Sequence, residues 1–267
     1  VVRRQETADI AIEKGIVDRV VLSFAVIASE LGEGDVVFIA VPTLAVRDTL
    51  SDVNAQLDAL VTVTDGASVK GSVVDAVRDV YGSIPTQFVP GHPIAGSEKS
   101  GVTAADANLY INHRVIITPL AETGDAHTQR VKAMWQAAQA EVLTMTVEEH
   151  DSVLAATSHL PHAIAYSLVD TLANDSENEN IFRYAAGGFR DFTRIASSDP
   201  RMWHDIMQAN NTEVLKAIDL FQNNLGQLRQ AIESGDSDYL FKTFTRAKEA
   251  RDQFTSLLIS NAQATEK

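Results

Sequence analysis

The segment Asp35-Val36-Val37-Phe38-Ile39-Ala40-Val41-Pro42 indicates the architecture of the first half of this chain. The run is short, apolar and rich in β-branched residues, and it lies between Gly34 and Pro42. Such runs are typical of strands that are buried on both faces of a parallel sheet. Residues 61–64 and 114–117 repeat the pattern, with helical stretches between the runs. Strands that alternate with helices predict a doubly wound α/β sheet.

The second half of the chain is helical in pattern. Strand signals end at about His150, and apolar residues then recur at steps of three and four, which is the spacing of one buried helix face. The clearest run consists of Val214, Leu215, Ile218, Phe221, Leu225 and Leu228. We therefore expect an α/β domain over residues 1–149, followed by an all-α domain over residues 150–267.

Composition excludes several classes of function. The chain has 22 Lys and Arg against 36 Asp and Glu, which gives a net charge of -14 and disfavours binding to nucleic acid or to anionic membranes. The chain has no Cys, which excludes disulfides, thiol nucleophiles and Cys-ligated metals. No apolar run reaches the roughly 18–20 residues of a membrane span. We expect a cytoplasmic protein.

Two loops carry residues that a packed core does not require. Residues 65–71 follow a predicted strand and place Ser68 and Lys70 between two glycines, where doubly wound folds bind ligands. A plain tight turn is the alternative there. In residues 90–101, His92 stands between Gly and Pro, outside any helical or strand period. Its near-neutral pKa suits proton acceptance during an oxidation, and a hydrogen bond to the backbone is the alternative.

The helical half contributes two further motifs. His159 and His162 are three residues apart on one helical face, without the H-E-x-x-H pattern of a zinc site. Arg190 and Arg194 follow a Gly-Gly pair and suit the binding of carboxylates, or alternatively they pair with Asp191 or Asp199. Asp199-Pro200 predicts a helix start, with Asp as the cap.

Together, the segments DGASVKG, GHPIAGSEKSGV, SHLPH and GGFRDFTRIASSDPRMW resemble the prephenate dehydrogenase family, including its cyclohexadienyl and arogenate branches. The resemblance covers nearly the whole chain, with the segments in the family's order. It implies a Rossmann-like NAD(P)-binding domain, here incomplete, and an all-α domain that forms a homodimer. It also implies oxidation of prephenate or arogenate at the ring hydroxyl with NAD+ or NADP+, with loss of CO2, in tyrosine biosynthesis.

The resemblance also assigns roles to individual residues. His92 would take the hydroxyl proton, and Ser68 would help to hold the hydroxyl. The positions that match the family's substrate pocket are Ser97, Glu98, His162, Asp191, Arg194, Trp203 and, near the active site in related dimers, Gly187. No metal is expected.

The cofactor-binding motif is the part of the family pattern that this sequence lacks. No G-x-G-x-x-G occurs, and Val1-Val2 resembles the end of a strand, so we expect the phosphate-binding turn before Val1 and weak cofactor binding without it. The remaining cofactor positions are Arg3, Arg4, Thr7, Val41, Pro42 and, less firmly, Lys70, which could instead be structural. An Arg in place of an acid favours tolerance of NADP+, although stacking on the adenine is equally open.

Two other interpretations are open. One is a different two-domain dehydrogenase, such as a β-hydroxyacid dehydrogenase, although that class relies on a catalytic Lys in its helical domain. The other is a non-catalytic dimerisation or regulatory module derived from such an enzyme. The missing glycine motif favours the second interpretation, whereas the presence of Ser68, His92, His162 and Arg194 disfavours it.

Overall fold

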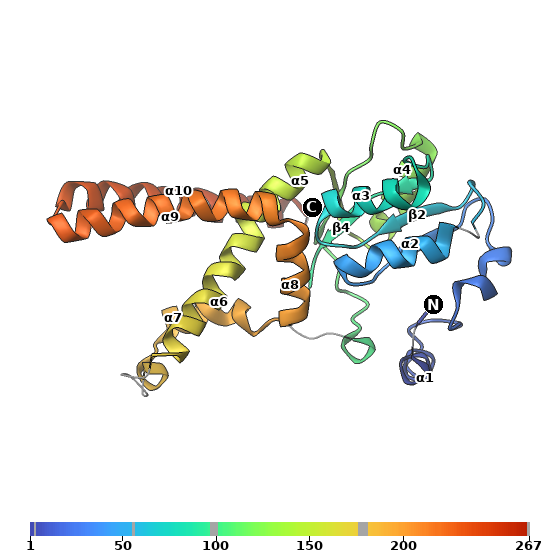
Figure 1. The fold of residues 1–267 in the computed structure, drawn as a ribbon, viewed down its shortest axis with the longest axis horizontal. Coiled ribbons are helices and arrows are strands. Elements are labelled where there is room, and N and C mark those ends of the chain that lie inside the picture. The colour runs from blue at the N-terminus through green and yellow to red at the C-terminus, as the bar shows by residue number, and fades with distance from the viewer. Residues whose placement is uncertain (3, 55–56, 97–100, 176–180, 266–267) are drawn as a thin grey trace. The chain divides into compact units, whose positions relative to one another are not determined.

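A parallel sheet forms the core of the N-terminal half (Figure 1). The computed structural model describes residues 1–2, 4–54, 57–96, 101–175 and 181–265. The strands of this sheet, in spatial order, are β1 (Val36–Ile39), β2 (Thr62–Asp65) and β3 (Phe88–Val89). Ile39 lies opposite Asp65, so β1 and β2 end at the same edge. Every side chain of β2 is buried, as the apolar run predicts.

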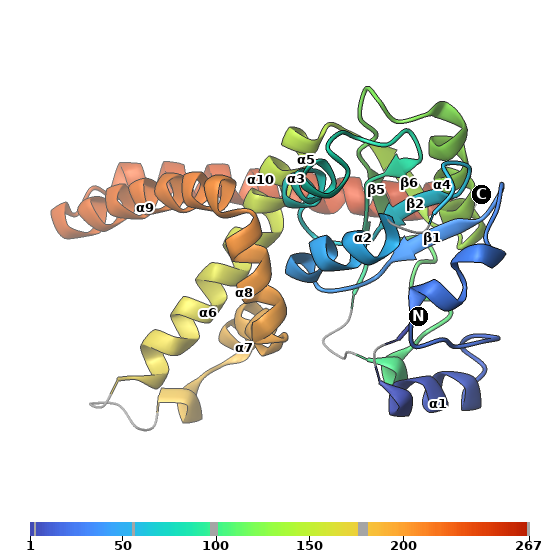
Figure 2. The same cartoon turned by 45° about the vertical axis from the view of Figure 1, so that its right-hand side comes forward.

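A second sheet continues the chain after Pro90. Its strands are β4 (Gly91–Ile94), β5 (Arg114–Ile117) and β6 (Glu141–Thr144), with β5 in the middle (Figure 2). β4 runs antiparallel to β5, and β6 runs parallel to it. β5 coincides with the predicted run, whereas β4 occupies a segment that was expected to be a loop. The fold class is the predicted α/β arrangement followed by helices.

The α-helices of the described residues are α1 (Gln5–Glu13), α2 (Val46–Asn54), α3 (Lys70–Tyr81), α4 (Asp125–Ala137), α5 (Val147–Leu154), α6 (Leu160–Ala173), α7 (Gly187–Thr193), α8 (Pro200–Ala209), α9 (Asn211–Ser234) and α10 (Ser237–Thr265). Leu50 of α2 and Val77 of α3 pack with Val63 in one buried cluster, while Trp135 of α4 packs against the second sheet. As predicted, Asp199 caps α8 and accepts the N–H of Arg201 at 2.7 Å.

A wide turn interrupts the helical rod that α5 and α6 form. α5 begins with a capping box, in which Thr146 and Glu149 each accept the other's backbone N–H. Residues Ala155–His159 then form a π-helical turn before α6 starts at Leu160. Such turns re-aim the side chains that follow them and are frequent at functional sites.

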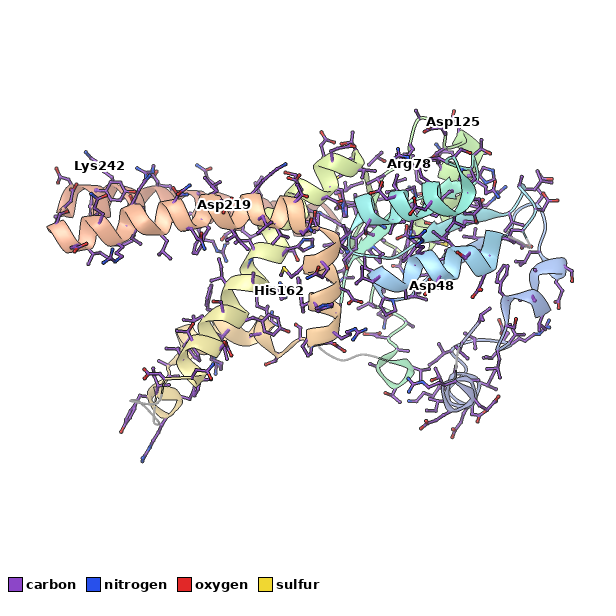
Figure 3. All side chains as sticks on the ribbon, in the orientation of Figure 1. Asp48, Arg78, Asp125, His162, Asp219 and Lys242 are labelled. Carbon is purple, nitrogen blue, oxygen red and sulfur yellow. The ribbon has the colours of Figure 1, made fainter. Side chains whose placement is uncertain are left out.

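The structure divides into two compact units, Val1–Val214 and Leu215–Lys267. In the second unit, α9 and α10 lie side by side, joined at Gly235 (φ 69°), and Tyr239 donates a hydrogen bond to Gln227 (Figures 1 and 2). Asp219 and Lys242 stand on the surface of this pair (Figure 3). The predicted buried face is wrong for the single chain: Val214 is buried, but Leu215 and Leu225 are exposed, because within the described residues no element of the unit covers them.

The N-terminal residues do not form the predicted strand end. Val2 donates its N–H to the carbonyl of Val21 at 3.1 Å, and neither residue belongs to a sheet. α1 ends at Glu13, and Gly15 follows its C-cap residue Lys14 with φ 64°, a left-handed conformation that favours glycine. Among the helices that the structure describes, none combines the length and apolar character needed to cross a membrane.

Candidate active site

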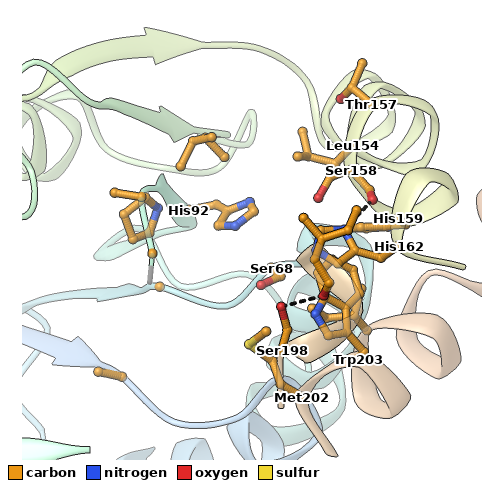
Figure 4. Close-up of a pocket in the computed structure, with 18 of the residues that line it drawn as sticks. Ser68, His92, Leu154, Thr157, Ser158, His159, His162, Ser198, Met202 and Trp203 are labelled. Carbon is orange, nitrogen blue, oxygen red and sulfur yellow. Dashed lines mark hydrogen bonds between the residues drawn. The ribbon is translucent and has the colours of Figure 1, made fainter. Parts of the chain in front are cut away.

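A cavity of about 740 Å³ opens at the carboxyl edge of the first sheet. Gly66 and Ser68 reach it from the loop after β2, and His92 reaches it from β4. His159, His162 and Trp203 line the other side from the helices (Figure 4). Carboxyl edges of parallel strands are where folds of this kind bind ligands, so this cavity is the candidate active site.

Most of the residues that the sequence marked as catalytic or substrate-binding meet here, namely Ser68, His92, His162, Arg194 and Trp203. Among the described residues, Gly187 and Asp191 do not line the cavity, and both are exposed in α7. Asp191 instead accepts the Nε–H of Arg190 at 3.1 Å, which is the alternative pairing that the sequence left open. Ser97 and Glu98 lie outside the described residues.

His92 belongs to a strand, which corrects the expectation of a loop. It is only 9% exposed and lies opposite Ile116 of β5. The neighbouring Pro93 is compatible with this because β4 is an edge strand of its sheet. Gly91 is required because a Cβ there would lie 3.1 Å from the backbone oxygen of Asp65. The flanking Gly and Pro therefore serve the strand and fix the ring of His92 at the cavity wall.

Behind His92 lie two residues that the sequence reasoning missed. His92 Nδ1 is 2.9 Å from Nε2 of His150, and Nδ1 of His150 is 2.7 Å from Oδ1 of Asp151. His150 is fully buried and Asp151 nearly so. The sequence does contain a local pattern at this place. The capping box Thr146-x-x-Glu149 predicts the start of a helix, and the adjacent residues His150 and Asp151 follow it directly, in the first turns of that helix.

The environment keeps the cavity histidines uncharged. Burial, reinforced by repulsion from His150, Lys70 and His159, holds the pKa of His92 well below its usual range. Burial likewise lowers the pKa of His159 to about 4, against the opposing attraction of Asp151. A neutral imidazole can accept a proton, whereas an imidazolium cannot.

Lys70 has the structural role that the sequence left open. It is fully buried and does not line the cavity; its ammonium contacts the Asp65 carboxylate and the Gly91 carbonyl. Burial lowers the pKa of Lys70, while the Asp65 carboxylate acts in the opposite direction. The ion pair ties the end of β2 to the start of β4 and so supports His92.

The rings of His162 and Trp203 are stacked, with centroids 3.5 Å apart. His162 donates from Nδ1 to the Ser158 carbonyl at 2.9 Å, which leaves its Nε2 as an acceptor. Within the described residues, Trp203 Nε1 is buried without a hydrogen-bond partner. A buried N–H without a partner costs stability. Arg194 adds a positive charge to the same lining.

A second cavity, of about 640 Å³, brings together the predicted cofactor residues Arg4, Thr7, Val41 and Pro42. Ala40 and Val41 line both cavities. Arg3 lies outside the described residues. The end of this cavity at Arg4 is cationic and fits the adenosine side of a dinucleotide. The other end is apolar, adjoins the first cavity and fits the nicotinamide side. In the described ranges, no group of three or more His, Asp or Glu side chains could hold a metal ion.

A parallel sheet whose carboxyl edge carries two adjoining cavities, with a helical segment supplying basic residues, defines a two-domain nucleotide-binding protein. The model of the prephenate dehydrogenase nucleotide-binding domain matches residues 2–144, and that of the prephenate dehydrogenase dimerisation domain matches residues 146–246. The chain belongs to the prephenate dehydrogenase family, as the sequence motifs indicate.

Individual relatives agree with this family. A cyclohexadienyl dehydrogenase of Zymomonas mobilis is 39% identical over 222 residues, which are 82% of this chain and 75% of the relative. A prephenate dehydrogenase of Bacillus subtilis is 38% identical, over 92% of this chain and 66% of the relative. The crystal structure of A. aeolicus prephenate dehydrogenase with hydroxyphenyl propionate and NAD+ has a TM-score of 0.87 at 38% identity, over 94% of this chain and 86% of that one.

Proposed function

We propose that this protein catalyses the oxidative decarboxylation of prephenate or arogenate with NAD+ or NADP+, in tyrosine biosynthesis. The observation that carries the proposal is the buried, uncharged His92 on the wall of a cavity that also holds Arg194. A base and a carboxylate-binding cation are the groups that this reaction requires of the protein. Family membership and the complex of the A. aeolicus relative with hydroxyphenyl propionate and NAD+ support the same reaction.

In this proposal, the side chains position the substrate and accept one proton. A nicotinamide cofactor held beside Val41 and Pro42 would supply the hydride acceptor for the oxidation of the hydroxyl-bearing ring carbon. His92 takes the hydroxyl proton as the carbonyl forms, and Ser68 holds the hydroxyl oxygen. Loss of CO2 makes the ring aromatic, so the protein's main contribution is to hold the substrate in the reactive geometry.

Substrate recognition rests on local positive charge. The substrate carries two carboxylates, and a chain of net charge -14 repels it unless a cation stands in the site. Arg194 suits one carboxylate through a bidentate pair, while His162 and Trp203 contact the side chain of the substrate. Ser97, Glu98, Asp191 and Gly187 remain proposed substrate contacts, with the last two approaching the site in a dimer.

The cofactor side is proposed at the second cavity. Arg4 and Thr7 would face the adenosine ribose, together with Arg3, and Val41 and Pro42 would face the nicotinamide ribose. An Arg at this position favours tolerance of NADP+ alongside NAD+. We further propose a homodimer held by the helices of residues 150–267, a domain boundary at residues 149/150, and a cytoplasmic location.

The test is reduction of NAD+ and of NADP+ by the full-length protein, with prephenate and with arogenate as substrates. His92→Asn should lower kcat by roughly 10²–10⁴, as expected when a general base is lost. Arg78→Gln, at an exposed position of α3 outside the cavity, is the matched control and should leave the rate unchanged. A folded protein that reduces neither cofactor with either substrate would identify a non-catalytic module or a different substrate.

A further inference from the structure

Asp151 lies at a junction of hydrogen bonds behind the cavity. Its Oδ1 accepts the backbone N–H of Lys70 at 2.8 Å, and its Oδ2 accepts that of Gly71 at 2.7 Å, both at the start of α3. Burial raises the pKa of the Asp151 carboxyl, but hydrogen bonds from His150 and from these backbone groups outweigh burial and lower the pKa overall. The carboxylate is therefore ionised at neutral pH and can only accept hydrogen bonds.

The carboxylate fixes where the protons of two rings lie. Since Asp151 cannot donate, the proton in its 2.7 Å contact belongs to Nδ1 of His150. Burial lowers the pKa of His150, so its ring carries a single proton and Nε2 is a bare acceptor. His92 must then donate from Nδ1 across 2.9 Å, which leaves Nε2 of His92 bare.

A second set of contacts starts from the backbone of the same residue. The carbonyl oxygen of Asp151 accepts from the side-chain amide nitrogen of Asn210 at 2.9 Å, which fixes the orientation of this amide. The same nitrogen lies 3.2 Å from Nδ1 of His159, and it can only donate. Nδ1 of His159 is therefore an acceptor, and the ring proton of His159 is on Nε2.

We propose that Asp151 is a positioning residue that fixes the tautomers of two of the cavity histidines, its carboxylate acting on His92 through His150 and its carbonyl acting on His159 through Asn210. His92 then presents a bare Nε2, which accepts, and His159 presents Nε2–H, which donates. Asp151 thus makes Nε2 of His92 a proton acceptor and Nε2–H of His159 a hydrogen-bond donor in the same cavity.

This inference rests on the proposed function for its catalytic consequence. When the substrate O–H bond breaks, its proton passes to Nε2 of His92, and the electron pair of that bond stays on oxygen to form the carbonyl. The imidazolium keeps its Nδ1–H on Nε2 of His150, and the Asp151 carboxylate stabilises the new charge. Nε2–H of His159 is available to a substrate oxygen.

The first experiment reads the tautomers directly in the unaltered protein. In ¹⁵N-histidine-labelled protein at pH 7, the ring-nitrogen spectrum should show His92 and His150 protonated at Nδ1 and His159 protonated at Nε2. His92 protonated at Nε2, or His159 at Nδ1, overturns the inference. The stated tautomers in a protein that turns over neither substrate support the inference and overturn the proposed function instead.

The second experiment separates the two arms. Asp151→Leu keeps the backbone carbonyl but removes both carboxylate oxygens, so no acceptor holds the proton of His150 on Nδ1. His92 should then lose its single Nδ1-protonated form, and His159 should be unchanged. Asn210→Leu should release the tautomer of His159 and leave that of His92 unchanged. Loss of the correct tautomer in a serine protease triad costs about 10⁴ in kcat, and we expect a similar loss in kcat for Asp151→Leu, with KM changed less than threefold.

A matched control exists in α8, where the buried Asp205 accepts from the neighbouring His204 at 2.9 Å. Asp205→Asn removes a carboxylate from the same kind of His-Asp pair and should leave the spectra of His92 and His159 unchanged. If Asp151→Leu keeps both the Nδ1 proton of His92 and the wild-type kcat, the carboxylate does not set the base and the inference is wrong.

Discussion

His162 and Trp203 stack face to face, with ring planes 20° apart and centroids separated by 3.5 Å, although they belong to different helices. The stack joins α6 to α8 at the cavity and holds the indole so that its Nε1 remains buried without a partner in the part of the chain that the structure describes. The stacked rings therefore form one rigid side of the cavity, and the N–H of the indole is a hydrogen-bond donor.

Trp203→Phe tests that donor. Phenylalanine keeps an aromatic face against His162 but removes the N–H, so a neutral hydrogen bond to substrate is lost. Such a bond contributes about 0.5–1.5 kcal/mol, and KM for substrate should rise roughly two- to tenfold with kcat little changed. Initial-rate kinetics measure this. An unchanged KM would show that the indole only packs.

Arg194→Lys tests the proposed carboxylate contact. Lysine keeps the charge but lacks the planar fork that grips both carboxylate oxygens, so KM for substrate should rise by about tenfold or more. Arg194→Gln should raise KM further because it also removes the charge. Arg78→Gln is the control, since Arg78 is exposed and lies outside the cavity. Equal KM values for Arg194→Lys and the wild type would exclude a bidentate contact.

The depressed pKa of His159 predicts a loss of stability in mild acid. In the unfolded chain the ring titrates near 6.5, whereas in the folded protein its pKa is about 4. The unfolded state therefore binds more protons between these values, so stability is fully present above pH 6.5 and falls as the pH drops toward 4. This one group accounts for up to about 3 kcal/mol.

Denaturant titrations from pH 7 to pH 4.5 measure this slope. His159→Gln should reduce this slope, because glutamine does not titrate, and the slope that remains comes from His92, His150 and His162, whose pKa values burial also lowers. His113→Gln, at an exposed histidine, should leave the slope as in the wild type. A slope that stays unchanged in His159→Gln would contradict the assignment of the proton uptake to His159.

Gly91→Ala should disturb both stability and catalysis. The added Cβ would lie 3.1 Å from the Asp65 backbone oxygen, in a buried strand next to His92. We expect a loss of about 1–3 kcal/mol in the free energy of unfolding, together with a lower kcat. Gly226→Ala is the opposite case: it lies in α9 with no atom near its added Cβ, and should be neutral or stabilising.

Local sequence patterns predicted the elements whose own residues determine them. Residues 114–117 form β5 because their β-branched side chains suit a buried strand, and Asp199 starts α8 because its carboxylate caps the first N–H groups. β4 was missed because Gly91 and Pro93 hide the strand pattern, and pairing with β5 creates the strand. Tertiary pairing of this kind leaves no local signal.

Some residues of the site could also be found from local sequence, and others could not. Ser68, His92 and Arg194 were identified because they follow or adjoin glycines, at positions where the packing of a core does not require polar side chains. His150 and Asp151 resemble ordinary helix residues, and their role depends on contact with His92, which is 58 residues away from His150. The exposed leucines of α9 were misjudged because apolar spacing predicts that a face is covered but does not identify what covers it.

The π-helical turn at Ala155–His159 sets the direction in which the side chains of the following helix, α6, point. Each residue of an α-helix advances the direction of its side chain by about 100°, so one residue more or less in this turn rotates everything after it by that angle. His162, which stacks on Trp203 at the cavity, would then swing away from it, and Tyr166 would lose its hydrogen bond to the Ser198 carbonyl. The spacing between the Asp151 junction and the cavity wall is therefore fixed by chain length, and an insertion or deletion in this turn changes it even when no cavity residue is substituted.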